Sequence, residues 1–489
     1  MNIIKKSLII AAMGAALSSS SYAITTGNSV VYITGSTGFR GTINTWFASQ
    51  AGGSGYSNNL VAWDGGTSNS LANFAAAKNL AYTNIPVTVN GTPTNVDVVF
   101  AFGGSEAGIQ ATFAPTNNPK QLSFYNIGAL TSATGMTNTV AAGSDVYHTN
   151  ANTSFQTPTM TFSDTSQAAS YFQGGTMSQD GVTYLKCNVA AGVTGGASGT
   201  GGQKIAVLPF GFYASKNAPF TNLSSGAWYD ILTTVGGVPM SELTGSTNDD
   251  TTNSIYLQPV GRNVDSGTRM NMQAMAHIPK TVNFQQVKPT ASGGLITAIN
   301  LEINATINGI SQLAGNNGES SGGTVAGFLT NDGTSYGTYL VGYIALADSV
   351  AKYPGGIVPL TYNGVQGRAY SVASTTNPSI NPAWSNAALG GSIGGLGYLD
   401  QGYTNIITGA YPYWGYEHVM YNTNTASNAT VAGATVALYN SFVSTNNGIR
   451  SLSSTNTFMY GGIKLEDMQI QRSGTTVDGG PVAPGAALQ

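Results

Sequence analysis

The chain has 489 residues, of which 8% are charged, and its 17 basic and 20 acidic side chains give a formal net charge of −3. This balance excludes the basic surface of a nucleic-acid-binding protein, and a single cysteine, Cys187, excludes an intramolecular disulfide. Such a length exceeds what one hydrophobic core usually serves, so at least two domains are expected.

Residues 1–23 have the pattern of an export signal. Lys5 and Lys6 precede the apolar run SLIIAAMGAAL, which is too short to cross a bilayer, and SSSSYA ends in the small-x-small pattern of a cleavage site. We expect cleavage after Ala23 and a periplasmic or secreted protein. No cysteine near the site could form a lipobox, and no later stretch is long and apolar enough for a membrane span in the mature chain.

Short apolar runs then alternate with helix-compatible stretches. The predicted strands are SVVYITG (29–35), NLVAW (59–63), VDVVFAFGG (96–104), KIAVLPFGFYAS (204–215), SIYLQPVGR (254–262) and YLVGYIALAD (339–348). The predicted helices are SNSLANFAAAKN (68–79), GAWYDILTTV (226–235) and TRMNMQAMAHI (268–278). This order predicts an α/β fold with a largely parallel sheet and ligands at the carboxyl ends of its strands. Polar segments near 112–203 and 371–408 are interpreted as long insertions.

The first predicted turn, VYITGSTGFRG, resembles the glycine-rich turn of short-chain dehydrogenases. Those enzymes need a Tyr and a Lys separated by three residues, and YASK at 213–216 has the wrong spacing. An exported protein would also meet little nicotinamide. The sequence therefore favours neither a dinucleotide nor any other cofactor.

A second stretch, VGRNVDSGTRMN, predicts an anion site. Arg262 stands four residues before Ser266, which opens a predicted helix with Gly267 and Thr268. The first backbone N–H groups of a helix lie at the positive end of its dipole, and an arginine offers a planar fork of donors that suits a tetrahedral oxyanion.

These residues resemble the phosphate-binding proteins of bacterial phosphate ABC transporters, whose pattern is Arg, three residues, then Ser-Gly-Thr. Four further motifs of this chain occur in the same order as in the family: YITGSTGF, AWDGGTSNSL, VDVVFAFGGSEAG and AYPYWGYEHVMY. The resemblance implies a bilobal type 2 periplasmic-binding-protein fold, with two α/β domains joined by a two-strand hinge near IAVLPFGFYAS and AYPYWGYEHV. The first lobe would comprise 24–206 plus 412–489, and the second 207–411.

The resemblance also implies the residues of an anion site: Ser36, Thr37, Gly38, Thr67 or Ser68, Ser105, Glu106, Arg262, Ser266, Gly267 and Thr268. The first turn is one residue shorter than in the family, so either Thr37 or Gly38 could face the ligand. Glu106 stands where the family has Asp. A carboxylate can only accept hydrogen bonds, so it would favour protonated phosphate over sulfate.

Each of these assignments has a structural alternative. Glu106 could complement a helix dipole, Arg262 could form a salt bridge, and the first turn could simply join a strand to a helix. His148, His277 and His418 lack metal-ligand spacing, and GxSxG matches at 333–337 and 390–394 lack the surroundings of a hydrolase elbow. No metal and no catalytic residue is expected.

The expected partner is inorganic phosphate or a similar oxyanion, bound by a monomer, and delivery to an ABC permease remains open. A secreted or cell-surface structural protein that retains the fold is the alternative from another class, because charged residues are so scarce. A binding protein for sulfate, molybdate or an organic anion is the third.

Overall fold

The computed structural model describes residues 28–49, 60–63, 77–130, 153–178, 180–188, 202–246, 255–280, 282, 284–302, 306–307, 310–311, 315–350, 352, 356–367, 403–444, 448–449, 463, 465, 468–472 and 482–484. The predicted signal, Thr67, Ser68, His148, most of the predicted helix 68–79 and the match at 390–394 lie outside these residues. Among the described helices, none is long and apolar enough to cross a membrane.

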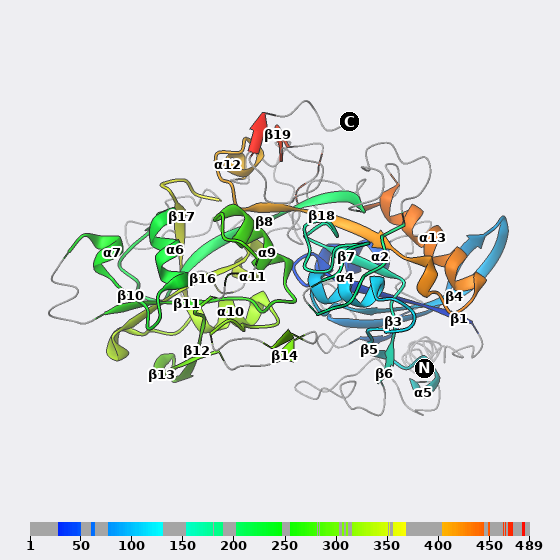
Figure 1. The fold of residues 1–489 in the computed structure, drawn as a ribbon, viewed down its shortest axis with the longest axis horizontal. Coiled ribbons are helices and arrows are strands. Elements are labelled where there is room, and N and C mark those ends of the chain that lie inside the picture. Colours follow the sequence, from blue (N-terminus) through cyan, green and yellow to red (C-terminus); the bar gives the residue numbers. More distant parts are fainter. Residues whose placement is uncertain are drawn as a thin grey trace, which may run out of the picture.

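One mixed sheet of twelve strands organises the molecule, in the order β10-β11-β16-β8-β18-β7-β1-β4-β3-β2, with β17 attached to β8 and β9 attached to β17 (Figure 1). Its strands are β1 (Ser29–Gly35), β2 (Leu60–Trp63), β3 (Asn79–Val89), β4 (Thr92–Ala101), β7 (Met160–Ser163), β8 (Gln203–Ser215), β9 (Asn222–Leu223), β10 (Val238–Pro239), β11 (Tyr256–Val260), β16 (Thr338–Ala345), β17 (Ile357–Tyr362) and β18 (Trp414–Tyr421).

The sheet is mixed, so the prediction of a largely parallel sheet is wrong. β1 pairs in parallel with β4 and β7, and β11 with β16, but β2, β3, β8, β10 and β18 all make antiparallel pairs. Asn90 and Gly91, both with positive φ (51° and 81°), form the two-residue turn between β3 and β4. A turn of this kind joins neighbouring strands that run in opposite directions.

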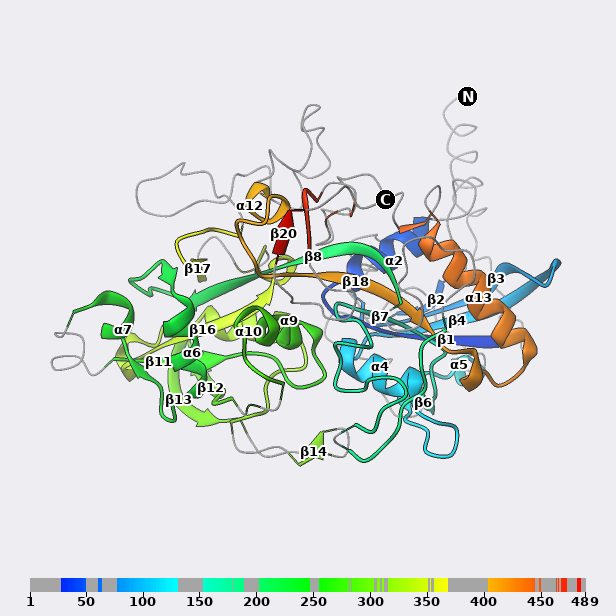
Figure 2. The same ribbon diagram turned by 45° about the horizontal axis from the view of Figure 1, so that its top comes forward.

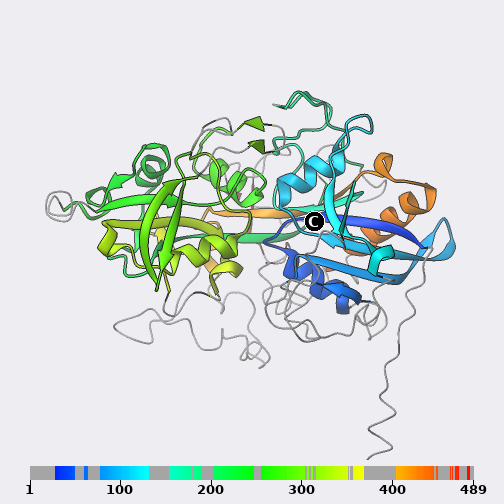
Figure 3. The ribbon, with the colours of Figure 1, turned by 90° about the horizontal axis from the view of Figure 1, so that it is seen from below.

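The elements form two halves joined through β8. The first half holds β1–β4, β7 and β18, and the second holds β9–β11, β16 and β17. Residues 203–209 of β8 pair with β18, whereas 210–214 pair with β16, so β8 carries the chain from one half to the other. Figures 2 and 3 show β8 and β18 running together between the halves. The predicted α/β fold with two connecting strands is thus confirmed.

Helices cover both faces of the sheet. In the first half, α2 (Arg40–Ser49) and α13 (Ala429–Val443) share one face, where Phe47 stacks on Phe442 with ring centroids 6.1 Å apart. α4 (Ser105–Phe113) covers the opposite face with a separate core cluster, and Figure 3 shows it across the sheet from α2. In the second half, α6 (Ser225–Thr233) and α9 (Gly267–Met275) pack on the face that holds the fully buried Trp228, and α10 (Gly322–Leu329) packs on the other face, against Gly342.

Smaller elements complete the described chain. They are β5 (Leu122–Tyr125), β6 (Thr153–Gln156), β12 (Val287–Ser292), β13 (Leu295–Leu301), β14 (Thr306–Ile307), β15 (Ile310–Ser311), β19 (Ile470–Arg472), β20 (Val482–Pro484), α5 (Ile127–Leu130), α7 (Ser241–Thr244), α11 (Leu346–Val350), α12 (Thr404–Ile407), η3 (Thr334–Tyr336) and η6 (Thr423–Thr425).

β7 lies inside the segment that the sequence presents as an insertion. Its four residues are all buried, and it fills the place between β1 and β18, with Ile33 opposite Met160. A strand of four residues leaves too short an apolar pattern to be recognised in a polar segment. Its position matters because Asp164, directly after it, comes to lie beside the end of β1.

Candidate anion-binding site

The first half contributes the ends of three adjacent parallel strands. Ser36 follows β1, Asp164 follows β7, and Ser105 follows β4 as the first residue of α4; all three are buried. Because the carboxyl ends of parallel strands meet at one edge of a sheet, these side chains gather there. The Ser105 hydroxyl donates to Asp164 Oδ1, and the Asp164 backbone N–H donates to Ser105 Oγ at 3.3 Å.

The second half contributes the start of α9. Ser266 occupies the N-cap position with a φ of −99°, but its side chain makes no capping bond. Its hydroxyl is buried and has no hydrogen-bond partner among the described residues. A buried hydroxyl without a partner is costly, and the first N–H groups of a helix also lack partners within that helix. Unused donors therefore converge at this helix start.

Two glycines allow the halves to meet closely. A Cβ at Gly267 would overlap Asp164 Oδ1 and would lie 2.6 Å from its Cγ. Gly104 has a φ of +120°, and a Cβ there would lie 2.5 Å from the carbonyl oxygen of Asp265. Across the same contact, Thr268 Oγ1 donates to Asp164 Oδ2 at 3.3 Å. Asp164 is therefore bonded from both halves.

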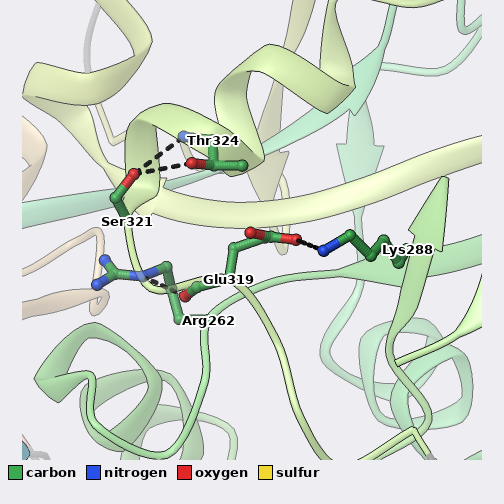
Figure 4. Close-up of polar contacts among 5 residues, drawn as sticks. All are labelled: Arg262, Lys288, Glu319, Ser321 and Thr324. Atoms are coloured by element: carbon green, nitrogen blue, oxygen red, sulfur yellow. Dashed lines mark hydrogen bonds and ion pairs between the residues drawn. The ribbon is translucent and has the colours of Figure 1, made fainter. Parts of the chain in front are cut away.

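Arg262 is buried between the halves, with 1% of its surface exposed. Its Nε donates to the Glu319 carbonyl at 3.1 Å, and its Nη2 donates to the Ser320 carbonyl at 2.9 Å and to Thr37 Oγ1 at 3.2 Å. The Glu319 carboxylate instead turns to Lys288, 3.3 Å away (Figure 4). Within the described chain, each hydrogen bond of this guanidinium ends on a neutral oxygen, which argues against a salt bridge.

Burial shifts the pKa values of Arg262 and of the carboxyl group of Asp164. Burial lowers the pKa of Arg262, while Asp348 and Asp164 favour its charged form. Burial raises the pKa of Asp164, and the Ser105 hydroxyl and Arg262 act in the opposite direction. Asp348 lies against the start of α10, since a Cβ at Gly322 would lie 2.8 Å from the Asp348 Cγ. One buried cation is thus flanked by two carboxyl groups.

Glu106 is fully buried but is engaged within the first half. Its carboxylate accepts hydrogen bonds from Thr165 Oγ1 and Ser170 Oγ, both at 2.7 Å, and from the Tyr171 N–H at 3.0 Å. It therefore holds the segment 165–171 in place. The acid that bonds where the halves meet is Asp164, which the sequence analysis did not single out. The signal for it was the short apolar run MTFS followed by Asp-Thr-Ser.

The residues of the first turn have two different roles: one supports the turn itself, and another contacts the second half. Ser36 Oγ accepts the N–H of Phe39 at 3.3 Å, so it supports the turn into α2. Thr37 presents its hydroxyl to Arg262, whereas Gly38 packs against Leu208, 3.0 Å from where its Cβ would lie. Of the two residues left open by the short turn, Thr37 is the one whose side chain reaches the second half.

The structure thus brings most of the proposed residues together. Those with a contact across the two halves are Thr37, Gly38, Ser105, Arg262, Gly267 and Thr268, with Asp164 added, and Ser36 and Ser266 adjoin them in sequence. Thr67 and Ser68 lie outside the described residues. Across the described ranges, no cluster of His, Cys, Asp and Glu side chains could hold a metal ion.

Comparison with known proteins gives structural neighbours of one kind. A putative phosphate ABC transporter substrate-binding protein with bound phosphate from Clostridium perfringens is 12% identical, with a TM-score of 0.36, over 89% of this chain and 99% of that one. A phosphate-binding protein from Stenotrophomonas maltophilia is 15% identical, with a TM-score of 0.36, over 90% and 91%. An ABC-type phosphate transport receptor from Vibrio cholerae is 10% identical, with a TM-score of 0.33, over 89% and 99%.

These solved structures belong to the class of protein that the sequence motifs resemble. No family model matches the chain, and no curated protein matches it. Because every TM-score above is below 0.5, we derive the function from the side chains of the site and not from these neighbours.

Proposed function

We propose that this chain binds a protonated inorganic oxyanion, phosphate above all, between its two halves, and that it acts as an extracytoplasmic solute-binding protein and not as an enzyme. One observation carries the proposal: Arg262 is a fully buried guanidinium whose hydrogen bonds end on neutral oxygens, and it stands four residues before Ser266, the N-cap of a helix start with unused donors. Such a group of donors suits a small anion removed from water.

The proposed site has many donors and one central acceptor. Arg262, the α9 N–H groups and the Ser266 hydroxyl would donate to the anion. Asp164 would accept, in the role that the sequence analysis gave to Glu106. An ionised carboxylate faces a P–OH group favourably but leaves two acceptors in contact when sulfate is bound, so the site should prefer phosphate.

The remaining parts of the proposal come from the sequence motifs. The segment 1–23 would direct export, and the lobes would comprise 24–206 with 412–489, and 207–411. Closure of these lobes would exclude water from the anion and strengthen each hydrogen bond. Delivery of the anion to an ABC permease would follow from the same resemblance.

The test is calorimetric titration of the mature chain with phosphate and with sulfate, after removal of bound anion by unfolding and refolding. Arg262→Ala removes hydrogen bonds from a charged donor, each contributing about 1.5–3 kcal/mol, so a loss of roughly a hundredfold or more in affinity is expected. Arg262→Lys keeps the charge without the planar fork and should recover little. Lys288→Ala, which removes a half-exposed cation, is the matched control and should bind normally.

A second candidate function rests on a different feature of the same residues. Thr268 bonds Asp164, and Arg262 bonds Thr37, so the halves are already tied together. In a cell-surface structural protein, these bonds could hold the two halves together permanently. It would give no heat with either anion, and Arg262→Ala would lower its unfolding midpoint instead. Tight phosphate binding, at least about a hundredfold above sulfate, would exclude it.

A further inference from the structure

A second carboxyl group lies beside Asp164, on the neighbouring strand. β18 pairs antiparallel with β7, and His418 stands opposite Ser163. Extended by one residue past the end of β7, the same register places Glu417 beside Asp164, whose charge acts on it. Residues directly opposite each other in an antiparallel pair point to the same face of the sheet, with Cβ atoms about 4.5–5.5 Å apart. Both side chains are buried, and Glu417 has no exposed surface.

Among the residues that the structure describes, Glu417 has no counterion and no well-formed hydrogen bond. Neither Oε1 nor Oε2 has a hydrogen-bond partner. The Ser36 hydroxyl lies near enough to favour the charged form, but without the geometry of a hydrogen bond. The nearest lysine on its strand pair, Lys204, lies over the ring of Tyr416, 3.8 Å from its centroid. Tyr416 precedes Glu417 and so points to the opposite face of the strand.

An ionised carboxylate in such surroundings is unfavourable. Removing a charge from water without a partner costs so much that the group binds a proton instead. Burial raises the pKa of Glu417 well above its usual range, the negative charge of Asp164 raises it further, and Ser36 acts in the opposite direction. Asp164 differs, because Ser105, Thr268 and Arg262 all stabilise its ionised form.

We propose that Glu417 and Asp164 form a carboxyl pair that shares one proton, carried by Glu417, and that this proton is a condition for anion binding. The inference rests on the proposed anion site. With Glu417 neutral, Asp164 is the single ionised acceptor that faces the anion. Once Glu417 ionises, two adjacent negative charges face it, and repulsion in a buried site opposes binding.

Glu106 shows what the same half does with a buried carboxylate that is not part of such a pair. It is as deeply buried as Glu417, but two hydroxyl groups and a backbone N–H donate to it. Its negative charge is also offset by Lys280. Within the described residues, Glu417 has only the nearby Ser36 hydroxyl, which forms no hydrogen bond to it, so a proton is the remaining way to satisfy that carboxyl group.

The first test is phosphate affinity as a function of pH, from about pH 5 to about pH 10. Glu417→Gln keeps the shape of the side chain and stays neutral. The wild type should lose about tenfold in affinity per pH unit above the Glu417 pKa, relative to this variant. Glu242→Gln, on the exposed helix α7, changes the net charge equally and should follow the wild type. Parallel profiles for the wild type and Glu417→Gln would overturn the proposal.

The second test measures the proton without any anion. A folded carboxyl group with a raised pKa holds a proton that the unfolded chain releases, so stability falls as pH rises from the ordinary value of 4.5. The folding constant of Glu417→Gln relative to the wild type should therefore rise about tenfold per pH unit above that value. Asp164→Asn, by removing the adjacent charge, should end this rise at a lower pH.

The two tests separate this inference from the proposed function. If no anion binds at any pH but the relative folding constant rises as described, the carboxyl pair stands and the anion function fails. If phosphate binds tightly but the relative folding constant stays flat with pH, Glu417 is ionised like an ordinary carboxyl group, and the shared proton is refuted.

Discussion

Substitution of Gly267 by alanine tests whether the contact between the halves is the site. Gly267 is the first residue of α9 and lies against Asp164 of the other half. An added Cβ would overlap Asp164 Oδ1 and lie 2.9 Å from the Ser105 Cβ. Asp164 cannot turn away freely, because Ser105 and Thr268 hold its carboxylate and Asn271 Nδ2 donates to its carbonyl at 2.6 Å.

The overlap can therefore be relieved mainly by moving the halves apart. Separation would break the bond between Thr268 and Asp164 and withdraw the helix start from the anion. Two hydrogen bonds to charged groups, at about 1.5–3 kcal/mol each, correspond to about 3–6 kcal/mol, or roughly a hundredfold to ten-thousandfold weaker binding. Each half should remain folded, since the added methyl group meets atoms of the other half.

Calorimetry with phosphate and small-angle X-ray scattering measure the two consequences separately. Gly267→Ala should bind phosphate more weakly and show a larger radius of gyration than the wild type. Gly226→Ala is the control, because a Cβ there meets open space in helix α6 and alanine favours a helix by about 0.5–1 kcal/mol. A Gly267→Ala protein with the wild-type affinity and radius of gyration would refute the reasoning.

Two further predictions concern stability. Trp228 is fully buried, its ring centroid lies 5.0 Å from that of Phe212, and its indole N–H donates to Met272 Sδ at 3.2 Å. Trp228→Ala should therefore lower the free energy of unfolding of the second half by about 3–5 kcal/mol, measured by urea unfolding. A loss below about 1 kcal/mol would contradict this packing. Lys280 Nζ donates across the halves to the Ser170 carbonyl at 2.9 Å, and burial lowers its pKa. As pH rises toward 10.5, the folded chain therefore binds fewer protons than the unfolded chain. The stability of the wild type should increase over that range, and the stability of Lys280→Met should not. Equal slopes of the urea unfolding midpoint against pH in the two proteins would contradict this prediction.

Much of the site could be found from the sequence because its key parts are local. Arg262 and Ser266–Thr268 lie within seven residues, and the end of a strand followed by a helix start fixes their relative positions. The first turn is local in the same way, since Gly35 ends β1 and α2 begins at Arg40. The long apolar runs likewise predicted β4, β8, β11 and β16 close to their observed bounds.

The sequence by itself thus determined the helix start, its arginine and the α/β class, because each depends on neighbours along the chain. The tertiary structure decided which carboxyl group lies beside that helix start and arginine. Asp164 and Glu417 are about 250 residues apart in sequence and become neighbours because β7 pairs with β18. Glu106 carries the sequence signal of a ligand, yet three donors of its own half hold it. Strand order and register, which no local pattern encodes, fix these partners.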